Sequence, residues 1–118
     1  MYQICIVLLA DINTPEAMGR MANALATVME CNETGDDVAL AFDGAGTQRL
    51  GEPSNPEHKH HGPFESVRHL TAAVCAYCAN AFDVAGQVGT AEPPLTSELR
   101  GHPSIRQFVN DGYQVISF

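Results

Sequence analysis

Two cysteines separated by two residues, Cys75 and Cys78, are the side chains of this sequence best suited to chemistry. A thiol becomes a useful nucleophile only as a thiolate, which a positive environment such as a helix N-terminus favours. The spacing leaves three interpretations open: buried apolar cysteines, half of a metal site, or a reactive thiol pair. From the spacing alone, simple burial has the same weight as the two chemical interpretations combined.

Histidines are the candidate partners for a metal at this pair. His58, His60 and His61 cluster in a stretch rich in glycine and proline. Their spacing lacks the regular zinc-finger form and a second CxxC is missing, so we assign no metal ligands, and whether this loop binds metal stays open.

The remaining cysteines and histidines have simpler explanations. Cys5 falls inside an apolar run and Cys31 at a predicted helix end, so we expect both to be structural or incidental. His69 fits a helix face, and His102, directly before Pro103, is placed to help cap the last helix. A catalytic role is the less favoured interpretation for either histidine.

The composition predicts a single acidic globular domain over residues 1–118. Hydrophobic residues make up 45% of the chain, and no stretch approaches the roughly 20 apolar residues that cross a bilayer, so we expect no membrane partner. A net charge of −8 repels phosphate backbones, which disfavours nucleic acid. No export signal precedes the first apolar run, so a cytoplasmic location with reduced thiols is expected.

The first half of the chain predicts a β-α-β unit. Tyr2–Ala10 is a nearly continuous apolar run, typical of a strand covered on both faces of a parallel sheet. A capping residue and a proline at 13–16 start a helix that should stop near 32–35, and Val38–Phe42 forms the second strand. Residues 43–63 then form a long loop.

The second half is predicted less sharply. A second helix begins near Pro63, while Ala72–Ala76 fits either its continuation or a short third strand. A third helix follows over 78–82, and Thr96–Arg100 allows one helical turn. The last helix starts at Pro103 and buries Ile105, Phe108 and Val109. Gly112 stops it, and a final strand covers 113–118.

Ligands of open parallel sheets bind beyond the carboxyl ends of the strands. This rule selects three segments, residues 11–14, 43–47 and 75–78. Gly44 and Gly46 follow the second strand, but the dinucleotide fingerprint would need another glycine where this chain has Arg49. A tight turn is therefore favoured over an anion nest, and no cofactor is assigned.

Four segments carry a resemblance to a known family. They are GDDVALAFDGAGT (35–47), CAYCANAF (75–82), GHPSIR (101–106) and GYQVISF (112–118). With the compatible first β-α unit, the chain resembles the DsrE/DsrF-like (DsrEFH-like, TusD-like) family of small sulfur-relay proteins over essentially its whole length. The family's fold would be α/β, with three layers (α/β/α) and a mainly parallel four- or five-stranded sheet.

The resemblance also implies a function. A cysteine near the start of the third helix would hold persulfide sulfur and pass it between donor and acceptor proteins, with Cys78 the first choice for the carrier and Cys75 the second. Relatives often form trimers or hexamers, so a homo-oligomer is expected. The CxxC pair and the histidine-rich loop depart from the sulfur-relay branches. A non-catalytic binding module and a CxxC thiol or zinc redox sensor therefore remain as alternatives.

Overall fold

The computed structural model describes residues 1–12, 14–50, 61–83, 97 and 99–118. The strands are β1 (Gln3–Leu8), β2 (Asp37–Phe42), β3 (Thr71–Val74) and β4 (Gln114–Ser117). The α-helices are α1 (Pro15–Glu33), α2 (His61–Val67), α3 (Ala76–Ala81) and α5 (Ile105–Asn110), and the 3-10 helices are η1 (Gly44–Leu50) and η2 (Arg68–Leu70).

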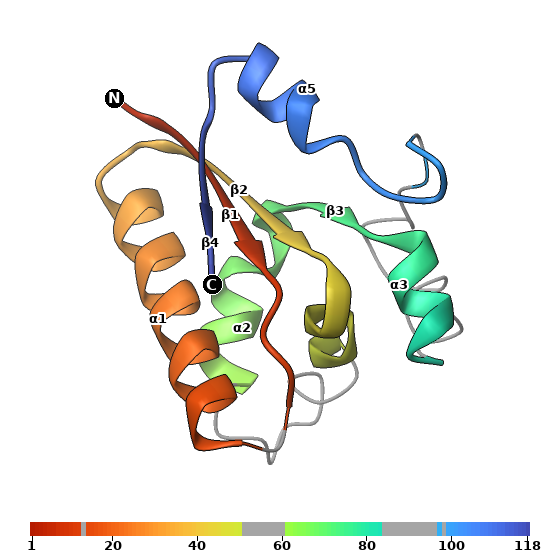
Figure 1. Ribbon diagram of the computed structural model, residues 1–118. Helices are drawn as coiled ribbons and strands as arrows, with labels where there is room; N and C mark the ends of the chain where they lie inside the picture. The colour runs from red at the N-terminus through yellow and green to blue at the C-terminus, as the bar shows by residue number, and fades with distance from the viewer. Residues whose placement is uncertain (13, 51–60, 84–96, 98) are drawn as a thin grey trace.

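The four strands form one parallel sheet in the order β3-β2-β1-β4 (Figure 1). Side chains of α1 and α2 pack with one face of this sheet, and side chains of α5 pack with the other. The predicted α/β class, with a parallel sheet between helical layers, is confirmed. No described helix is both long enough and apolar enough to cross a membrane.

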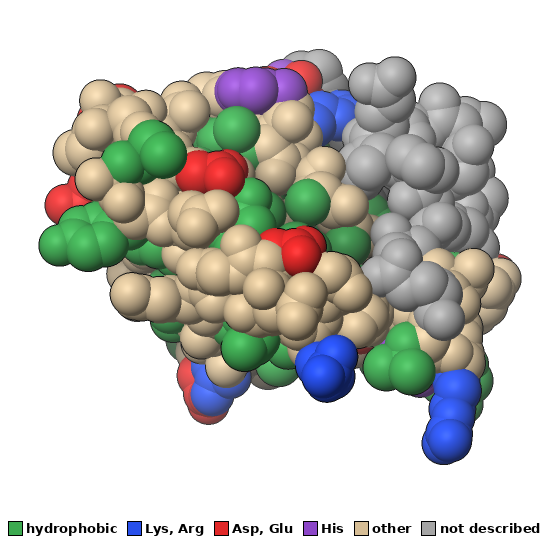
Figure 2. All heavy atoms as spheres, turned by 90° about the horizontal axis from the view of Figure 1, so that it is seen from above, with side chains coloured by type: hydrophobic (Ala, Val, Ile, Leu, Met, Phe, Trp, Pro, Cys, Tyr) green, Lys and Arg blue, Asp and Glu red, His purple; other side chains and the backbone are tan. Residues whose placement is uncertain are grey.

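One face of the surface is seen from above in Figure 2. On the part drawn in colour, hydrophobic side chains occur in several separate groups among polar atoms, and acidic side chains stand as isolated spots. The scattered acidic residues of the sequence therefore do not gather into one acidic patch on this face.

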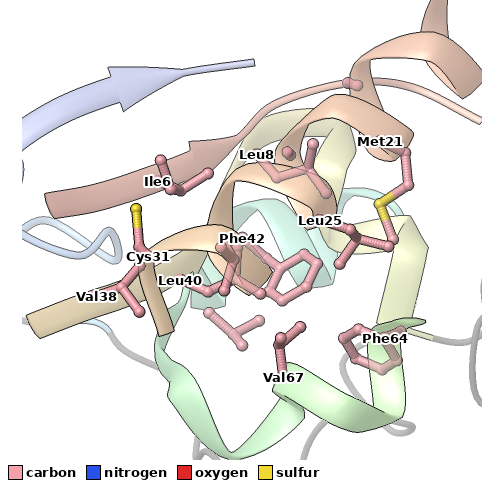
Figure 3. Close-up of a cluster of buried hydrophobic side chains, with 14 residues drawn as sticks. Ile6, Leu8, Met21, Leu25, Cys31, Val38, Leu40, Phe42, Phe64 and Val67 are labelled. Atoms are coloured by element: carbon pink, nitrogen blue, oxygen red, sulfur yellow. The ribbon is translucent and has the colours of Figure 1, made fainter. Parts of the chain in front are cut away.

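The larger core lies between the sheet and the two helices α1 and α2 (Figure 3). Alternate residues of β1 point into it, so Ile6 and Leu8 are fully buried there. Phe42 of β2 meets Phe64 of α2 edge to face, with ring centroids 5.9 Å apart. Each large side chain buried here stabilises the fold by about 1.5–3 kcal/mol relative to an exposed one.

The opposite face of the sheet carries smaller side chains. Its buried residues are Cys5, Val7, Ala39, Ala41 and Ala73. Only Ile105 and Phe108 of α5 pack against this face from the helix, whereas Val109 is 59% exposed. The prediction that Val109 is buried was wrong, because α5 packs only partly against the sheet: none of its six residues is fully buried, and Val109 lies near its C-terminal end.

The start of α1 follows its predicted signals. The Thr14 hydroxyl accepts a hydrogen bond from the Ala17 N–H at 3.0 Å, and Pro15 occupies the first helical position. The helix ends at Glu33, within the predicted stop, and β2 begins four residues later. The first β-α-β unit is thus confirmed.

Three local predictions needed settling or correction. The ambiguous stretch after α2 is a strand, β3, whose Ala73 and Val74 lie beside Ala41 and Phe42 of β2. The helical turn allowed over 96–100 lies partly outside the described residues. Among those described, the Gly101 N–H donates to the Ser97 carbonyl oxygen at 3.3 Å, and Leu99 and His102 exchange two backbone hydrogen bonds of 2.8 Å around a tight turn.

A right-handed helix cannot continue through Arg100 and Gly101, because both have positive φ, 50° and 91°. Pro103 also lies outside the helix that it was expected to open. Ser104 is the N-cap of α5, and its side chain accepts the Gln107 N–H at 3.1 Å. The last helix therefore begins two residues later than predicted.

Candidate Cys–His–Asp site

The carboxyl ends of β2 and β3 bring two of the candidate segments, 43–47 and 75–78, together. Asp43 follows β2 and Cys75 follows β3, and the Cys75 N–H donates to the Phe42 carbonyl oxygen at 2.9 Å. Of the three segments selected from the sequence, 43–47 and 75–78 meet here. Asp11 of the first segment accepts a hydrogen bond at 3.0 Å from the amide of Gln48, which follows the second segment in η1.

The local geometry of α3 sets the two thiols at different depths. Cys75 is the N-cap residue, and its Sγ accepts the Cys78 N–H at 3.4 Å. Cys75 is completely buried, whereas Cys78 is half-buried. The Cys78 thiol donates a hydrogen bond to Oδ1 of Asp43 at 3.4 Å. Simple burial of both cysteines therefore does not describe the pair.

The tight turn at 99–102 adds a histidine to the thiols. The Tyr77 N–H donates to the Gly101 carbonyl oxygen at 2.8 Å, which fixes the turn to the first residues of α3. A side chain at Gly101 would come within 3.2 Å of Cβ of Tyr77, so glycine suits both this contact and the positive φ. His102 then places Nδ1 3.1 Å from Sγ of Cys75.

His102 was expected to cap the last helix, and that expectation was wrong. Ser104 caps α5, and the imidazole of His102 turns toward the thiols. Its ring also lies against that of Tyr77, with centroids 4.8 Å apart and an interplanar angle of 37°. The aromatic contact on one side and the Cys75 sulfur on the other hold the orientation of the imidazole.

Asp43, Cys75, Cys78 and His102 together form what we name the Cys–His–Asp cluster. One ligand atom from each residue lies within 4.8 Å of the corresponding atoms of the other three. Only Cys75 is fully buried, and the other three residues are half-buried. The cluster thus combines two thiols, a carboxylate and an imidazole at a partly accessible edge of the sheet.

The electrostatic environment distinguishes Cys75 from an ordinary thiol. Burial raises the pKa of Cys75 to about 12, with smaller contributions that include the carboxylate of Asp43 and a partly opposing hydrogen bond from the Cys78 N–H. Cys75 is therefore a protonated thiol at neutral pH. Direct attack by this thiol on a molecule from solvent is disfavoured both by its charge state and by its burial.

The other two cysteines are structural, as the sequence indicated. Cys5 lies on the small-residue face of the sheet, where burial raises its pKa to about 11. Cys31 lies in the larger core, and its pKa is raised mainly by burial and further by the charges of Asp36 and Glu30. All four cysteines are free thiols.

The glycines after β2 serve close packing. A Cβ at Gly46 would lie 2.0 Å from the carbonyl oxygen of Leu8, so the backbone of η1 presses directly on the end of β1. The same oxygen accepts the Asp43 N–H at 3.1 Å. The Gly46 N–H donates to the Asp43 carbonyl oxygen at 2.9 Å, which makes the favoured tight turn and fixes the position of Asp43. The long loop predicted over 43–63 was wrong for its first residues, because this turn continues as the 3-10 helix η1.

The remaining histidines are placed as follows. His58 and His60 lie outside the described residues. His61 is half-buried at the start of α2, and His69 is exposed on η2. Among the histidines that the structure describes, His102 is the one that lies beside the cysteines, and the sequence favoured a capping role for it over a catalytic one.

Comparison with known proteins adds one distant relative. The chain is 27% identical over 96 residues to an uncharacterized protein of Methanocaldococcus jannaschii, an alignment that covers 81% of this chain and 78% of the relative. No family model matches the chain. No solved structure matches it.

Proposed function

We propose that this protein carries sulfane sulfur as a persulfide on Cys78. The observation that carries the proposal is the unequal depth of the CxxC pair, with Cys78 half-buried and Cys75 completely buried behind it. A partly accessible thiol can reach the sulfur of another molecule, while a completely buried one cannot. The resemblance to the DsrE/DsrF-like sulfur-relay proteins points to the same residue.

The chemistry needs only thiol exchange. The Cys78 thiolate attacks the outer sulfur of a donor persulfide, R–S–SH, forming a persulfide on Cys78 and releasing R–S⁻. An acceptor thiolate then attacks the outer sulfur of this persulfide, gaining –SH and returning the Cys78 thiolate. Both steps exchange one S–S bond for another, so the relay needs no external oxidant or reductant.

Cys75 decides whether the persulfide survives. If the Cys75 thiolate attacked the inner sulfur, a Cys75–Cys78 disulfide would form and HS⁻ would leave. Burial holds Cys75 as a thiol at neutral pH, because its pKa is about 12. A protonated Cys75 favours storage of the sulfur over its release as sulfide.

The surroundings of Cys78 suit delivery to another protein. The exposed side chains Tyr77, Phe82 and Leu99 are 60%, 42% and 51% accessible. They lie on α3 and on the turn bound to it, so apolar surface accompanies the reactive thiol. Contact through such side chains favours a donor or acceptor protein over a small polysulfide. Assembly of this chain into a trimer or hexamer belongs to the same proposal, and light scattering tests it.

The test is sulfur uptake followed by mass. Wild-type protein and the variants Cys75→Ser, Cys78→Ser and Cys31→Ser are exposed briefly to polysulfide in the presence of a chelator, and intact mass is measured. We expect one added sulfur atom in wild type and Cys31→Ser and none in Cys78→Ser. The Cys31→Ser protein is the matched control, because it also loses one of four cysteines.

Alkylation of the native protein at neutral pH gives a second readout. Cys78 should be labelled first, since Cys5, Cys31 and Cys75 are all buried. Failure of the folded wild type to gain sulfur would remove the carrier function. The binding-module alternative would then gain support if Cys75→Ser and Cys78→Ser left the oligomeric state unchanged.

A further inference from the structure

Beyond sulfur transfer, we infer that the Cys–His–Asp cluster is a zinc site whose ligands are Sγ of Cys75, Sγ of Cys78, Nδ1 of His102 and a carboxylate oxygen of Asp43. This inference does not depend on the proposed function, because metal binding needs only the four ligand atoms. It also differs from a site built with His58, His60 and His61.

The spacing of the four atoms is the main argument. Zinc bonds of about 2.3 Å to sulfur and about 2.0–2.2 Å to nitrogen or oxygen place tetrahedral ligands roughly 3.4–3.8 Å apart. Here Sγ of Cys75 lies 3.1 Å from Nδ1 of His102, and Sγ of Cys78 lies 3.4 Å from Oδ1 of Asp43. Since every pair lies within 4.8 Å, binding requires movements of about one ångström or less.

The chemical types of the ligands favour zinc among common cations. Thiolate and imidazole together select borderline-soft metals such as Zn²⁺, whereas Ca²⁺ and Mg²⁺ prefer all-oxygen sites. On binding the cation, the two thiols release their protons to solvent, so two thiolates and a carboxylate supply three negative charges. A neutral imidazole completes a fourfold shell. Four protein ligands leave no open position, which is typical of a structural or regulatory zinc rather than a catalytic one.

The backbone holds the ligands before any metal arrives. Cys75 is fixed by its N–H bond to Phe42, and Asp43 by its N–H bond to Leu8. His102 is fixed by its backbone bonds to Leu99 and by its ring contact with Tyr77. A site arranged in this way loses little conformational entropy when a cation enters it.

Binding of Co²⁺ and Zn²⁺ to untagged, reduced protein tests the inference. Cobalt in a tetrahedral site with two thiolates gives visible d–d bands and sulfur-to-metal charge-transfer absorption, and Zn²⁺ displaces it. We expect one Co²⁺ per chain in wild type. The His102→Ala and Asp43→Asn variants should bind about 100-fold more weakly or worse, since even loss of outer contacts to a metal ligand costs about 10–100-fold.

Matched variants separate the site from general effects. His69→Ala, which removes an exposed histidine of η2, should bind like wild type. Cys78→Ser should lose part of the charge-transfer band, and it changes a half-buried residue, so it keeps the test valid if Cys75→Ser fails to fold. The inference is overturned if folded wild type binds no stoichiometric metal. It is also overturned if binding survives in His102→Ala and disappears in a His58/His60/His61→Ala triple variant.

One consequence links the site to the proposed relay and rests on it. A Cys78 sulfur bound to zinc cannot also carry sulfane sulfur, so one equivalent of Zn²⁺ should block sulfur uptake and a chelator should restore it. Metal titration and sulfur uptake are measured separately. Failure of sulfur uptake in chelated protein would therefore refute the carrier function without affecting the metal site. Failure of metal binding would likewise refute the metal site without affecting the carrier function.

Discussion

The close approach of Gly46 to the end of β1 predicts that Gly46→Ala strongly destabilises the protein. The new Cβ would sit 2.0 Å from the Leu8 carbonyl oxygen, a contact that must open by at least 1 Å before it is tolerable. The same oxygen accepts the Asp43 N–H at 3.1 Å, so a shift of that size breaks the hydrogen bond. Relief of the clash with the new Cβ therefore also removes the hydrogen bond between Asp43 and Leu8.

Two contributions add to the loss in free energy of unfolding caused by Gly46→Ala. Forcing an extra methyl group into a packed region costs about 1–3 kcal/mol, and losing a buried backbone hydrogen bond costs about 1 kcal/mol more. For a chain of 118 residues, the unfolding entropy makes 1 kcal/mol worth about 4 °C in Tm. We therefore expect Gly46→Ala to lower Tm by about 8–16 °C in a circular dichroism melt.

Gly19→Ala is the matched control. Gly19 lies in the interior of α1, is exposed, and would place its Cβ in open space. Alanine is preferred to glycine in a helix by about 0.5–1 kcal/mol, so this variant should melt about 2–4 °C higher than wild type. A fall of less than about 3 °C for Gly46→Ala would show that η1 does not press on β1 in this way, and would refute the reasoning.

Two further predictions concern pH. The Cys5 thiol has a folded-state pKa of about 11, above the roughly 8.5 of a free thiol. Its contribution to the free energy of unfolding is therefore complete below about pH 8.5, and about 2–3 kcal/mol of it is lost as the pH rises toward 11. Urea unfolding at about pH 8.5 and about pH 11 should show this loss in wild type and a smaller loss in Cys5→Ala. The pKa of Asp36 is lowered by the hydrogen bond from the Tyr2 N–H and by that from the Thr34 hydroxyl, so its contribution is present above about pH 3.9 and disappears as pH falls through the lowered value. Asp36→Asn should therefore flatten the acid side of the Tm profile, and an unchanged acid side would contradict the assignment.

The parts of the fold that could be predicted are those with a long or strongly patterned signal. The apolar runs that became β1 and β2 contain enough buried residues to distinguish a covered strand from a helix. The Thr14 cap and Pro15 fixed the start of α1. By contrast, β3 has only four residues, and its apolar spacing fits a helix equally well, so only pairing with β2 decides it.

The candidate site could be predicted in part for a similar reason. The rule for the carboxyl ends of parallel strands selected the segments of Asp43 and of the two cysteines, and these do meet. His102 was missed because its position depends on the left-handed turn at Arg100 and Gly101, which has no strong signature in the sequence. A usable signal existed, however. In a β-α-β crossover the helix starts at the edge where strands end, so the residue ahead of the last helix belongs at this edge.

The cluster joins stretches of chain that are far apart in sequence. Asp43 and Cys78 are separated by 35 positions, and Cys75 and His102 by 27. A cation held by all four would act as a cross-link that closes two long loops of the unfolded chain, and the entropy of such loops is what a cross-link removes. Binding of the cation would then stabilise the folded carboxyl edge of the sheet, and unfolding of this edge would release the cation.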